Sequence, residues 1–352
     1  MSPVNHQSQR GFVLVSVLWV LVIMTLAASA FSVWVDRVRE QAYLRQQHTE
    51  TYRKSTDVLT KVVYTYLTGM KTSDGVAWPG VSGETSVQAK FDSLDDFMAG
   101  VAAKVTAPTS GFMRLDGSVL DMGNGVRVMV QDRAGLIGLS FLTDRKIFNS
   151  IATQAEKQMT AERLADTLSD YQDSDGIRRG QGAEEYDYSR EGLPPPMNGY
   201  LRSPLQLRSI IDWDVALRAR DDAWILRVFR NEGNSVINAN TASADALNVV
   251  LNNEQATQQI LGARAQQPYS RASDLIKFTG GSEDLLFSIT PAAGFRFWWW
   301  HEGDTTAHVY DVQFSPLDSG ADAWYFNWTA RVNLPDDLAQ STARTIDHPF
   351  FR

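Results

Sequence analysis

The sequence predicts an α+β fold in which a long N-terminal helix packs on an antiparallel β-sheet, with a large, mostly α-helical domain inserted between the strands. Three observations predict it. A run of 24 uncharged residues extends from Phe12 to Val35. Segments rich in alternating or aromatic residues occur at 125–131 and again beyond residue 293, as is typical of strands. The residues between these segments are mostly helical in character. We therefore expect one sheet that is divided in sequence and joined in space.

The apolar run from Phe12 to Val35 is long enough to cross a membrane. At about 1.5 Å of rise per residue a helix of this length spans roughly 36 Å, more than the hydrocarbon thickness of about 30 Å. A secretory signal has a shorter apolar stretch, of about 7 to 15 residues, with its cleavage site after that stretch. In this chain a polar segment, 1–11, precedes the run. We therefore expect the helix to be retained.

The junction Gln9-Arg10-Gly11-Phe12 resembles the leader of type IV prepilins and type II secretion pseudopilins. The resemblance implies that a prepilin peptidase cuts after Gly11 and N-methylates Phe12. Most members carry Glu as the fifth mature residue, whereas Ser16 stands there in this chain. A carboxylate buried in lipid is costly unless it is paired, so its absence fits a subunit with no neighbour above it. This departure resembles the K type, the general secretion pathway protein K family, which is thought to lie at the tip. Taken alone, the segment also fits an ordinary single-pass anchor.

The pilin resemblance also implies how the chain is divided. Leu59, Val62, Val63, Tyr66, Leu67 and Met70 recur at spacings of three and four and predict an apolar helix face that packs on the sheet. The expected divisions are a leader (1–11), the transmembrane and periplasmic halves of the N-terminal helix (12–35 and 36–72), a pilin-like α/β core split into 73–142 and 291–335, an inserted helical domain (143–290) and a tail (336–352).

The elements within these divisions follow from periodicity. Strands are expected at 125–131, 293–301, 305–314 and 324–334, and one long amphipathic helix at 148–168. Three consecutive tryptophans, Trp298 to Trp300, fit core or interface packing better than a sugar-binding or lipid-binding surface.

An acidic loop in the insertion is the best candidate for chemistry. Leu168 to Gly176 and Gly182-Ala183-Glu184 resemble the K-type stretch Asp-Trp-x-Asp-x-Asp followed by Gly-Ala-Glu. The spacing does not match an EF-hand, but hard oxygen ligands in a Gly-rich segment suit Ca²⁺, and known K-type proteins bind calcium in this domain. The alternative is a solvated acidic loop. The candidate calcium ligands are Asp170, Asp173, Asp175, Glu184 and Asp187.

Two further segments carry the K-type resemblance. Asn238-Ala239-Asn240-Thr241-Ala242 resembles the family signature Asn-x-Asn-Thr-Ala, and 132–140 resembles a family turn that usually has Asn where Gly138 and Ser140 stand here. The segment after the signature is laid out like helix-hairpin-helix modules, some of which bind DNA. Its first hairpin, at 252–254, contains no Gly to bring backbone amides to a phosphate. We therefore interpret it as a helical packing unit in which Thr241 or Ser243 caps a helix.

Composition narrows the class of function. The net charge of the 352 residues is -8, which argues against a nucleic-acid partner. Cysteine is absent, so disulfides cannot stabilise the fold, and its stability must come from the apolar core or from a metal ion. The five histidines are scattered and no nucleophile motif is present, which gives no support for an enzyme.

The sequence thus favours a minor pseudopilin at the tip of the type II secretion pseudopilus, which initiates and caps the filament that exports folded proteins across the outer membrane. By resemblance, its partners are the I-type and J-type minor pseudopilins, the major pseudopilin, prepilin peptidase and the inner membrane, with the body in the periplasm. The cations Arg37, Arg39 and Arg45 after the apolar run would by themselves favour the opposite orientation. The alternatives are a minor pilin of a type IV pilus and a single-pass periplasmic binding protein.

Overall fold

The computed structural model describes residues 10–78, 112–123, 125–155, 159–278, 286–315 and 322–346, without the side chains of 10–13 and 47–48. Most of the predicted leader, part of the predicted 73–142 segment and the end of the tail lie outside the described residues. The chain forms two units, Met1–Thr56 and Asp57–Arg352. Helix α1 (Arg10–Thr68) runs through the first unit and ends in the second.

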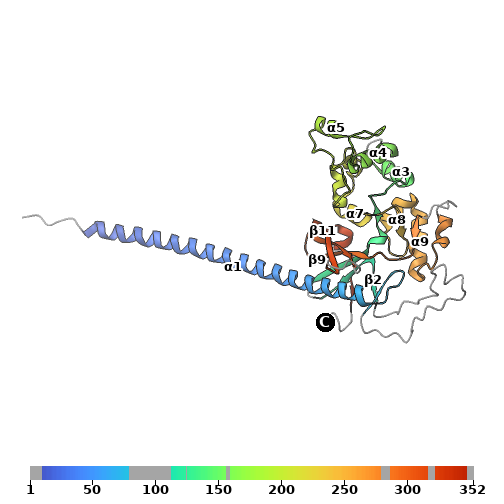
Figure 1. Cartoon of the computed structure of the whole chain (residues 1–352). Coiled ribbons are helices and arrows are strands. Elements are labelled where there is room, and N and C mark those ends of the chain that lie inside the picture. The colour runs from blue at the N-terminus through green and yellow to red at the C-terminus, as the bar shows by residue number, and fades with distance from the viewer. Residues whose placement is uncertain are drawn as a thin grey trace, which may run out of the picture. The chain divides into compact units, whose positions relative to one another are not determined.

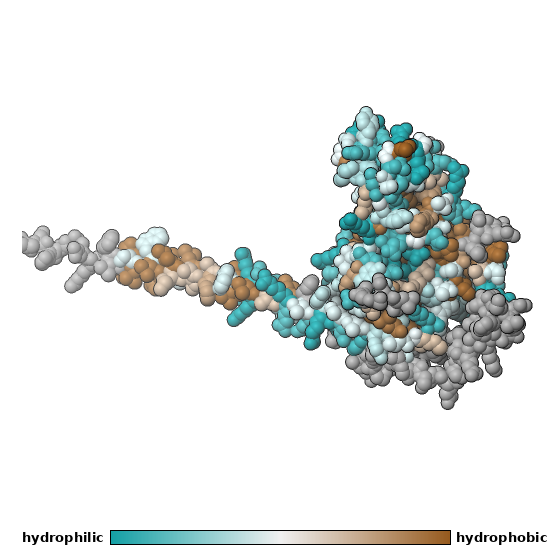
Figure 2. All heavy atoms as spheres, in the orientation of Figure 1, coloured by the Kyte–Doolittle hydropathy of each residue, from teal (hydrophilic) through white to brown (hydrophobic). Residues whose placement is uncertain are grey.

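Residues 14–35 of α1, in the first unit, are uncharged and mostly apolar, and Figure 2 shows hydrophobic residues along this part of the helix. The described residues contain one helix that is long and apolar enough to cross a membrane, and its apolar window is not buried within the chain. Leu18, Trp19 and Ile23 are each more than half exposed. A helix that is apolar all round needs an apolar surrounding, as the sequence predicted for 12–35.

The last turns of α1 pack on the sheet through an apolar face, as predicted. Val58, Leu59, Val62, Val63 and Tyr66 are buried in one cluster with β-sheet residues, and the rings of Tyr66 and Phe314 stack with centroids 4.8 Å apart.

The predicted face was wrong at its end, because Leu67 and Met70 are each 44% exposed. The helix stops at Thr68, where the chain turns so tightly that a Cβ on Gly69 would lie 2.4 Å from the carbonyl oxygen of Ala77.

The sheet joins segments that are distant in sequence, which confirms the predicted α+β fold. Its order is β11-β10-β9-β4-β3-β12, and all neighbours are antiparallel except β12 and β3. Strand β4 pairs with β9 from Val126 opposite His301 to Asp132 opposite Phe295. The strand bounds are β3 (Asp116–Asp121), β4 (Val126–Asp132), β9 (Gly294–His301), β10 (Thr306–Phe314), β11 (Trp324–Asn333) and β12 (Arg344–Thr345). A small separate pair consists of β1 (Gly75–Ala77) and β2 (Phe112–Arg114).

The three consecutive tryptophans lie in the core, as predicted. Trp298, Trp299 and Trp300 are at most 2% exposed. Trp299 packs on the α1 side of the sheet, whereas Trp298 and Trp300 pack on the other side with Leu226. Alternation along a strand sends successive side chains to opposite faces, so both faces of β9 are covered.

Residues between β4 and β9 form mostly short helices, and Figure 1 shows α7 between β11 and the group α3, α4 and α5. The single helix predicted for 148–168 was wrong. The chain leaves helical geometry at Ala155, and Thr160 starts a second helix by accepting a hydrogen bond from the Arg163 N–H. The bounds are η1 (Arg133–Gly135), α3 (Arg145–Gln154), α4 (Ala161–Gln172), α5 (Glu185–Arg190), η2 (Pro204–Ser209), α6 (Trp213–Ala216), α7 (Asp222–Val228), α8 (Ala244–Leu251), α9 (Glu254–Gln266) and η3 (Ala272–Phe278). This segment also contains two parallel strand pairs. They are β5 (Ile137–Gly138) with β6 (Phe229–Arg230), and β7 (Ile237–Asn238) with β8 (Phe287–Ser288). A further helix, α10 (Asp336–Ala339), follows β11.

The Asn-x-Asn-Thr-Ala signature forms part of the junction between these helices and the sheet. The Asp132 carboxylate, 1% exposed, accepts hydrogen bonds from Asn238 Nδ2 (3.1 Å) and Thr241 Oγ1 (2.8 Å). It also accepts from the N–H groups of Ala134 and Ala292, both at 2.9 Å. Burial raises the pKa of Asp132, and these four bonds oppose that shift. Ser243, one of the two predicted capping residues, caps α8 through the Ala246 N–H.

A second buried polar contact also crosses the junction. Arg296 and Asp311 are both 0% exposed, and Arg296 Nη2 lies 2.7 Å from Asp311 Oδ2. Arg296 Nη1 donates to the carbonyl oxygens of Leu226, in α7, and Phe229. A buried guanidinium must be both paired and hydrogen-bonded, so β9 and the end of α7 are held together.

We predict that Asp132→Ala destabilises the folded chain by about 3 to 5 kcal/mol, because it removes the buried acceptor of four hydrogen bonds. Chemical denaturation of the detergent-solubilised chain measures this change. Asp336→Ala is the control, because Asp336 is exposed and its expected cost is below about 0.5 kcal/mol. Equal effects of the two substitutions would contradict the role given to Asp132.

Candidate metal centre

The candidate site lies in the loop between α4 and α5. Helix α4 ends at Gln172, with Asp173 in extended geometry after it, and α5 begins after Glu184. Leu168, Ala183 and Tyr188 anchor the two ends of the loop in the core. The polar part of the loop is therefore held between two fixed ends.

Three of the five predicted ligands come together in this loop. Asp173, Asp175 and Glu184 each offer one carboxylate oxygen, and these oxygens all lie within 4.8 Å of one another. Glu184 is buried, Asp173 is half-buried and Asp175 is exposed. The cluster is therefore open on one side.

The other two predicted ligands have other partners. Asp170 is 0% exposed, and its carboxylate accepts from the Arg179 N–H at 3.1 Å and lies 3.3 Å from Arg179 Nε. Asp187 forms a capping box with Glu184 at the start of α5 and lies 3.7 Å from Arg178 Nη1. Both side chains therefore stabilise the loop.

Two buried oxygens in the cluster have no hydrogen-bond partner among the described residues: Asp173 Oδ1 and Glu184 Oε1. Buried polar atoms are rarely left unsatisfied. Burial raises the pKa of Glu184 from its usual 4.5 to about 7, and the nearby charges of Asp170, Asp173 and Asp175 add to the shift. The positive charge of Arg179 opposes this shift only in part.

These oxygens fit a hard divalent cation. Ca²⁺ takes six to eight oxygen ligands in flexible geometry, and three carboxylates with two unsatisfied buried oxygens supply part of that set. When bound, the cation would supply positive charge to the cluster and so favour ionised Glu184. Backbone carbonyl groups and water would have to complete its coordination.

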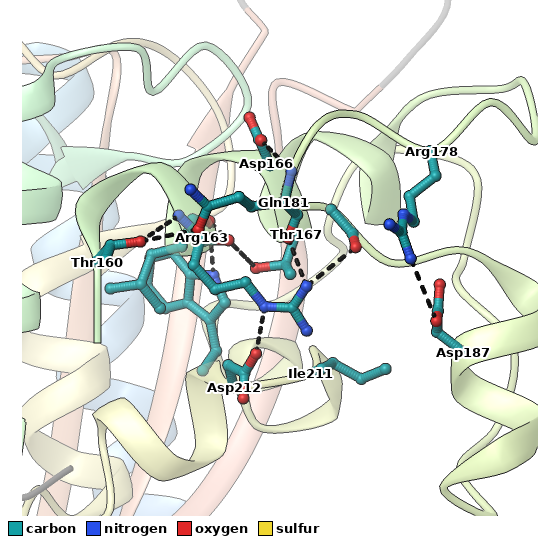
Figure 3. A network of polar contacts seen from close by, with 12 residues as sticks. Thr160, Arg163, Asp166, Thr167, Arg178, Gln181, Asp187, Ile211 and Asp212 are labelled. Atoms are coloured by element: carbon teal, nitrogen blue, oxygen red, sulfur yellow. Dashed lines mark hydrogen bonds and ion pairs between the residues drawn. The ribbon is translucent and has the colours of Figure 1, made fainter. Parts of the chain in front are cut away.

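The frame of the loop depends on residues that sequence reasoning did not single out. Arg163 on α4 donates to the carbonyl oxygens of Gln181 and Gly182 and to the carboxylate of Asp212, as Figure 3 shows for the labelled network. The loop passes so close to Asp170 that a Cβ on Gly182 would lie 1.8 Å from its Oδ2. The Gly-Ala-Glu stretch was a signal for this glycine, but the close approach depends on Asp170, twelve positions earlier in the chain.

The two predicted processing residues, Gly11 and Phe12, fall in the first turn of α1. The surroundings of these two residues lie outside what the structure describes.

In the presence of a chelator, we predict that Glu184 lowers the stability of the fold as pH rises from about 4.5 to 7. Its native-state pKa is raised, so over this window the native state binds more protons than the unfolded state and loses stability with rising pH. Glu184→Gln removes this contribution, and its advantage over the unaltered chain grows by on the order of 2 kcal/mol across the window. Chemical denaturation at several pH values measures this difference.

Glu185→Gln is the matched control, because Glu185 is the exposed neighbour of Glu184. It should follow the pH dependence of the unaltered chain. A Glu184→Gln chain with that same dependence would show that Glu184 carries no unusual proton affinity.

Comparison with known proteins finds a similarity to one family in part of the chain. Residues 143–225 match the family described as Type II secretion system (T2SS), protein K. Among solved structures, the chain is similar to one titled "The Crystal Structure of the GspK-GspI-GspJ complex from enterotoxigenic Escherichia coli Type 2 Secretion System", with 13% sequence identity, a TM-score of 0.41, and coverage of 58% of this chain and 79% of that chain. A search of curated proteins found no match. The match agrees with the K-type resemblance that the sequence predicted for this part of the chain.

Proposed function

We propose that this protein is a minor pseudopilin that lies at the tip of the type II secretion pseudopilus, where it initiates and caps the filament for export of folded proteins across the outer membrane. The observation that carries the proposal is the position of the protein K match. Residues 143–225 lie between β4 and β9, which are neighbours in one sheet. The helices between β4 and β9 are therefore inserted into a sheet that α1 also contacts. Its role is structural rather than catalytic.

The N-terminal helix supports assembly in the inner membrane with the body in the periplasm. Its apolar window would hold the chain in the bilayer after prepilin peptidase cleaves at Gly11 and methylates Phe12. Beyond the window, Val38 and Leu44 on α1 are 44% and 56% exposed, and such residues suit packing against helices of the I-type and J-type minor pseudopilins and the major pseudopilin. Ser16, in place of the usual Glu, spares the helix a costly intramembrane charge.

We also propose that calcium binds the loop between α4 and α5 as a structural ion. The unsatisfied oxygens of Asp173 and Glu184 and their proximity to Asp175 support it. Asp170 and Asp187 act in this proposal by fixing the loop.

Calcium at about one hundred times its dissociation constant should stabilise the fold by about 2.7 kcal/mol if it binds only the native state. The expected result is a higher melting temperature in calcium than in chelator, and a smaller rise for Glu184→Gln. Glu185→Gln should retain the full rise. An unchanged melting temperature in the unaltered chain would argue against a structural calcium ion.

Secretion in a deletion strain tests the proposed function. The unaltered chain should restore exoprotein secretion, and mass spectrometry of its mature N-terminus should find methylated Phe12. Gly11→Val should remain uncleaved and fail to restore secretion, because the β-branched side chain replaces the Gly at which the peptidase cuts. Gly262→Ala is a control away from the leader, since a Cβ at Gly262 meets no atom within 4 Å.

An intact Met1 in the functional chain would remove the basis for prepilin processing. Normal secretion with loss of twitching or adhesion in the deletion strain would instead favour a type IV pilus.

A further inference from the structure

Among the residues that the structure describes, the sheet has one long edge without a neighbouring strand, formed by β11. In the strand order β11 is terminal and has β10 as its one neighbour, while the opposite edge is formed by β12. Strand β12 has 2 residues and β11 has 10. A short edge strand offers few free backbone groups, whereas a long one is a template for another strand.

The hydrogen-bond phase of β11 identifies which backbone groups face outward. The Leu334 N–H donates to the Thr305 carbonyl oxygen at 2.9 Å, and residue pairs in an antiparallel ladder alternate between bonded and non-bonded. Counting back in the regular register, Ala330 and Val332 face β10. Thr329 and Arg331 therefore direct their N–H and C=O groups away from the sheet, and no backbone partner of theirs occurs among the described residues.

The usual protections against strand addition are largely missing from β11. Its sequence, WYFNWTARVN, contains no Pro or Lys. The charge of Arg331 is directed across the sheet, since its Nε donates to Thr306 Oγ1 on β10 at 2.9 Å. Tyr325 and Phe326 are 45% and 42% exposed. One irregularity interrupts the register, opposite Asp311 and Val312, and it leaves Trp328–Asn333 as a regular stretch.

We propose that β11 binds an extended, mostly uncharged strand of another pilin-type subunit, which adds to the sheet through backbone hydrogen bonds. This proposal rests on the proposed function. A helix satisfies its own backbone groups, so a row of free N–H and C=O groups at strand spacing is complementary to a strand. A second copy of this chain is disfavoured because each copy carries a net charge of -8 and like charges repel.

Residue-resolved hydrogen exchange of the full-length chain in detergent tests this proposal, with and without co-expressed I-type and J-type pseudopilins. We expect the amides of Thr329 and Arg331 to exchange at least about tenfold more slowly in the complex. The amides of Ala330 and Val332, which already bond to β10, are the internal controls and should change little. Thr329→Pro removes one outward N–H and should weaken the complex about tenfold. If this variant fails to fold, the hydrogen exchange of the unaltered chain still tests the proposal.

Three outcomes would overturn the proposal. A complex that forms without added protection at Thr329 and Arg331 would refute it and leave the proposed function intact. Protection that rises with the concentration of this chain alone would assign the edge to a second copy. Failure of the chain to associate with either pseudopilin would count against both proposals.

Discussion

The buried carboxylate of Asp132 is the constraint on which the joining of sheet and helices depends. Its four donors come from η1, from the segment of Asn238 and Thr241, and from Ala292. Because water does not reach the group, the donors must converge on it or the charge is unsatisfied. Arg296 acts in the same way for α7 with the opposite charge. The inserted helices are therefore held at their junction with the sheet by buried polar contacts as well as by apolar packing.

Asp132 and Glu184 are both buried carboxyl groups, but their hydrogen bonding gives them different roles. Both carboxyl groups are buried and burial raises both pKa values. Four donors point at the two carboxylate oxygens of Asp132. In contrast, Glu184 Oε1 has no hydrogen-bond partner among the described residues. A buried carboxylate whose oxygens all accept hydrogen bonds from the protein stabilises the fold. One with an oxygen that lacks a donor can still bind a ligand.

The sequence predicted the fold class and the main strands because their signals are local: a long apolar run, alternation and aromatic content. It did not show which polar side chains pair with one another. Asp170 and Asp187 carry the right ligand atoms, but they also pair with Arg179, with Arg178 and with the capping box. The division of the predicted 148–168 helix depends on a cap at Thr160. Gly138, which departs from the family Asn, has no room for a side chain, since a Cβ there would lie 2.4 Å from the backbone of Gly233.

The pairing of β4 with β9 has a consequence for how the chain folds. Asp132 and Phe295 are partners, and about 160 residues separate them, so closing that loop in an unfolded chain costs about 4 to 5 kcal/mol of entropy. Helices formed largely from local contacts can fold earlier than such a pairing. Once the intervening residues are compact, the effective loop is shorter and β9 meets β4 at a smaller entropic cost. If the inserted helices form first, they lower the entropic cost of joining the two halves of the sheet.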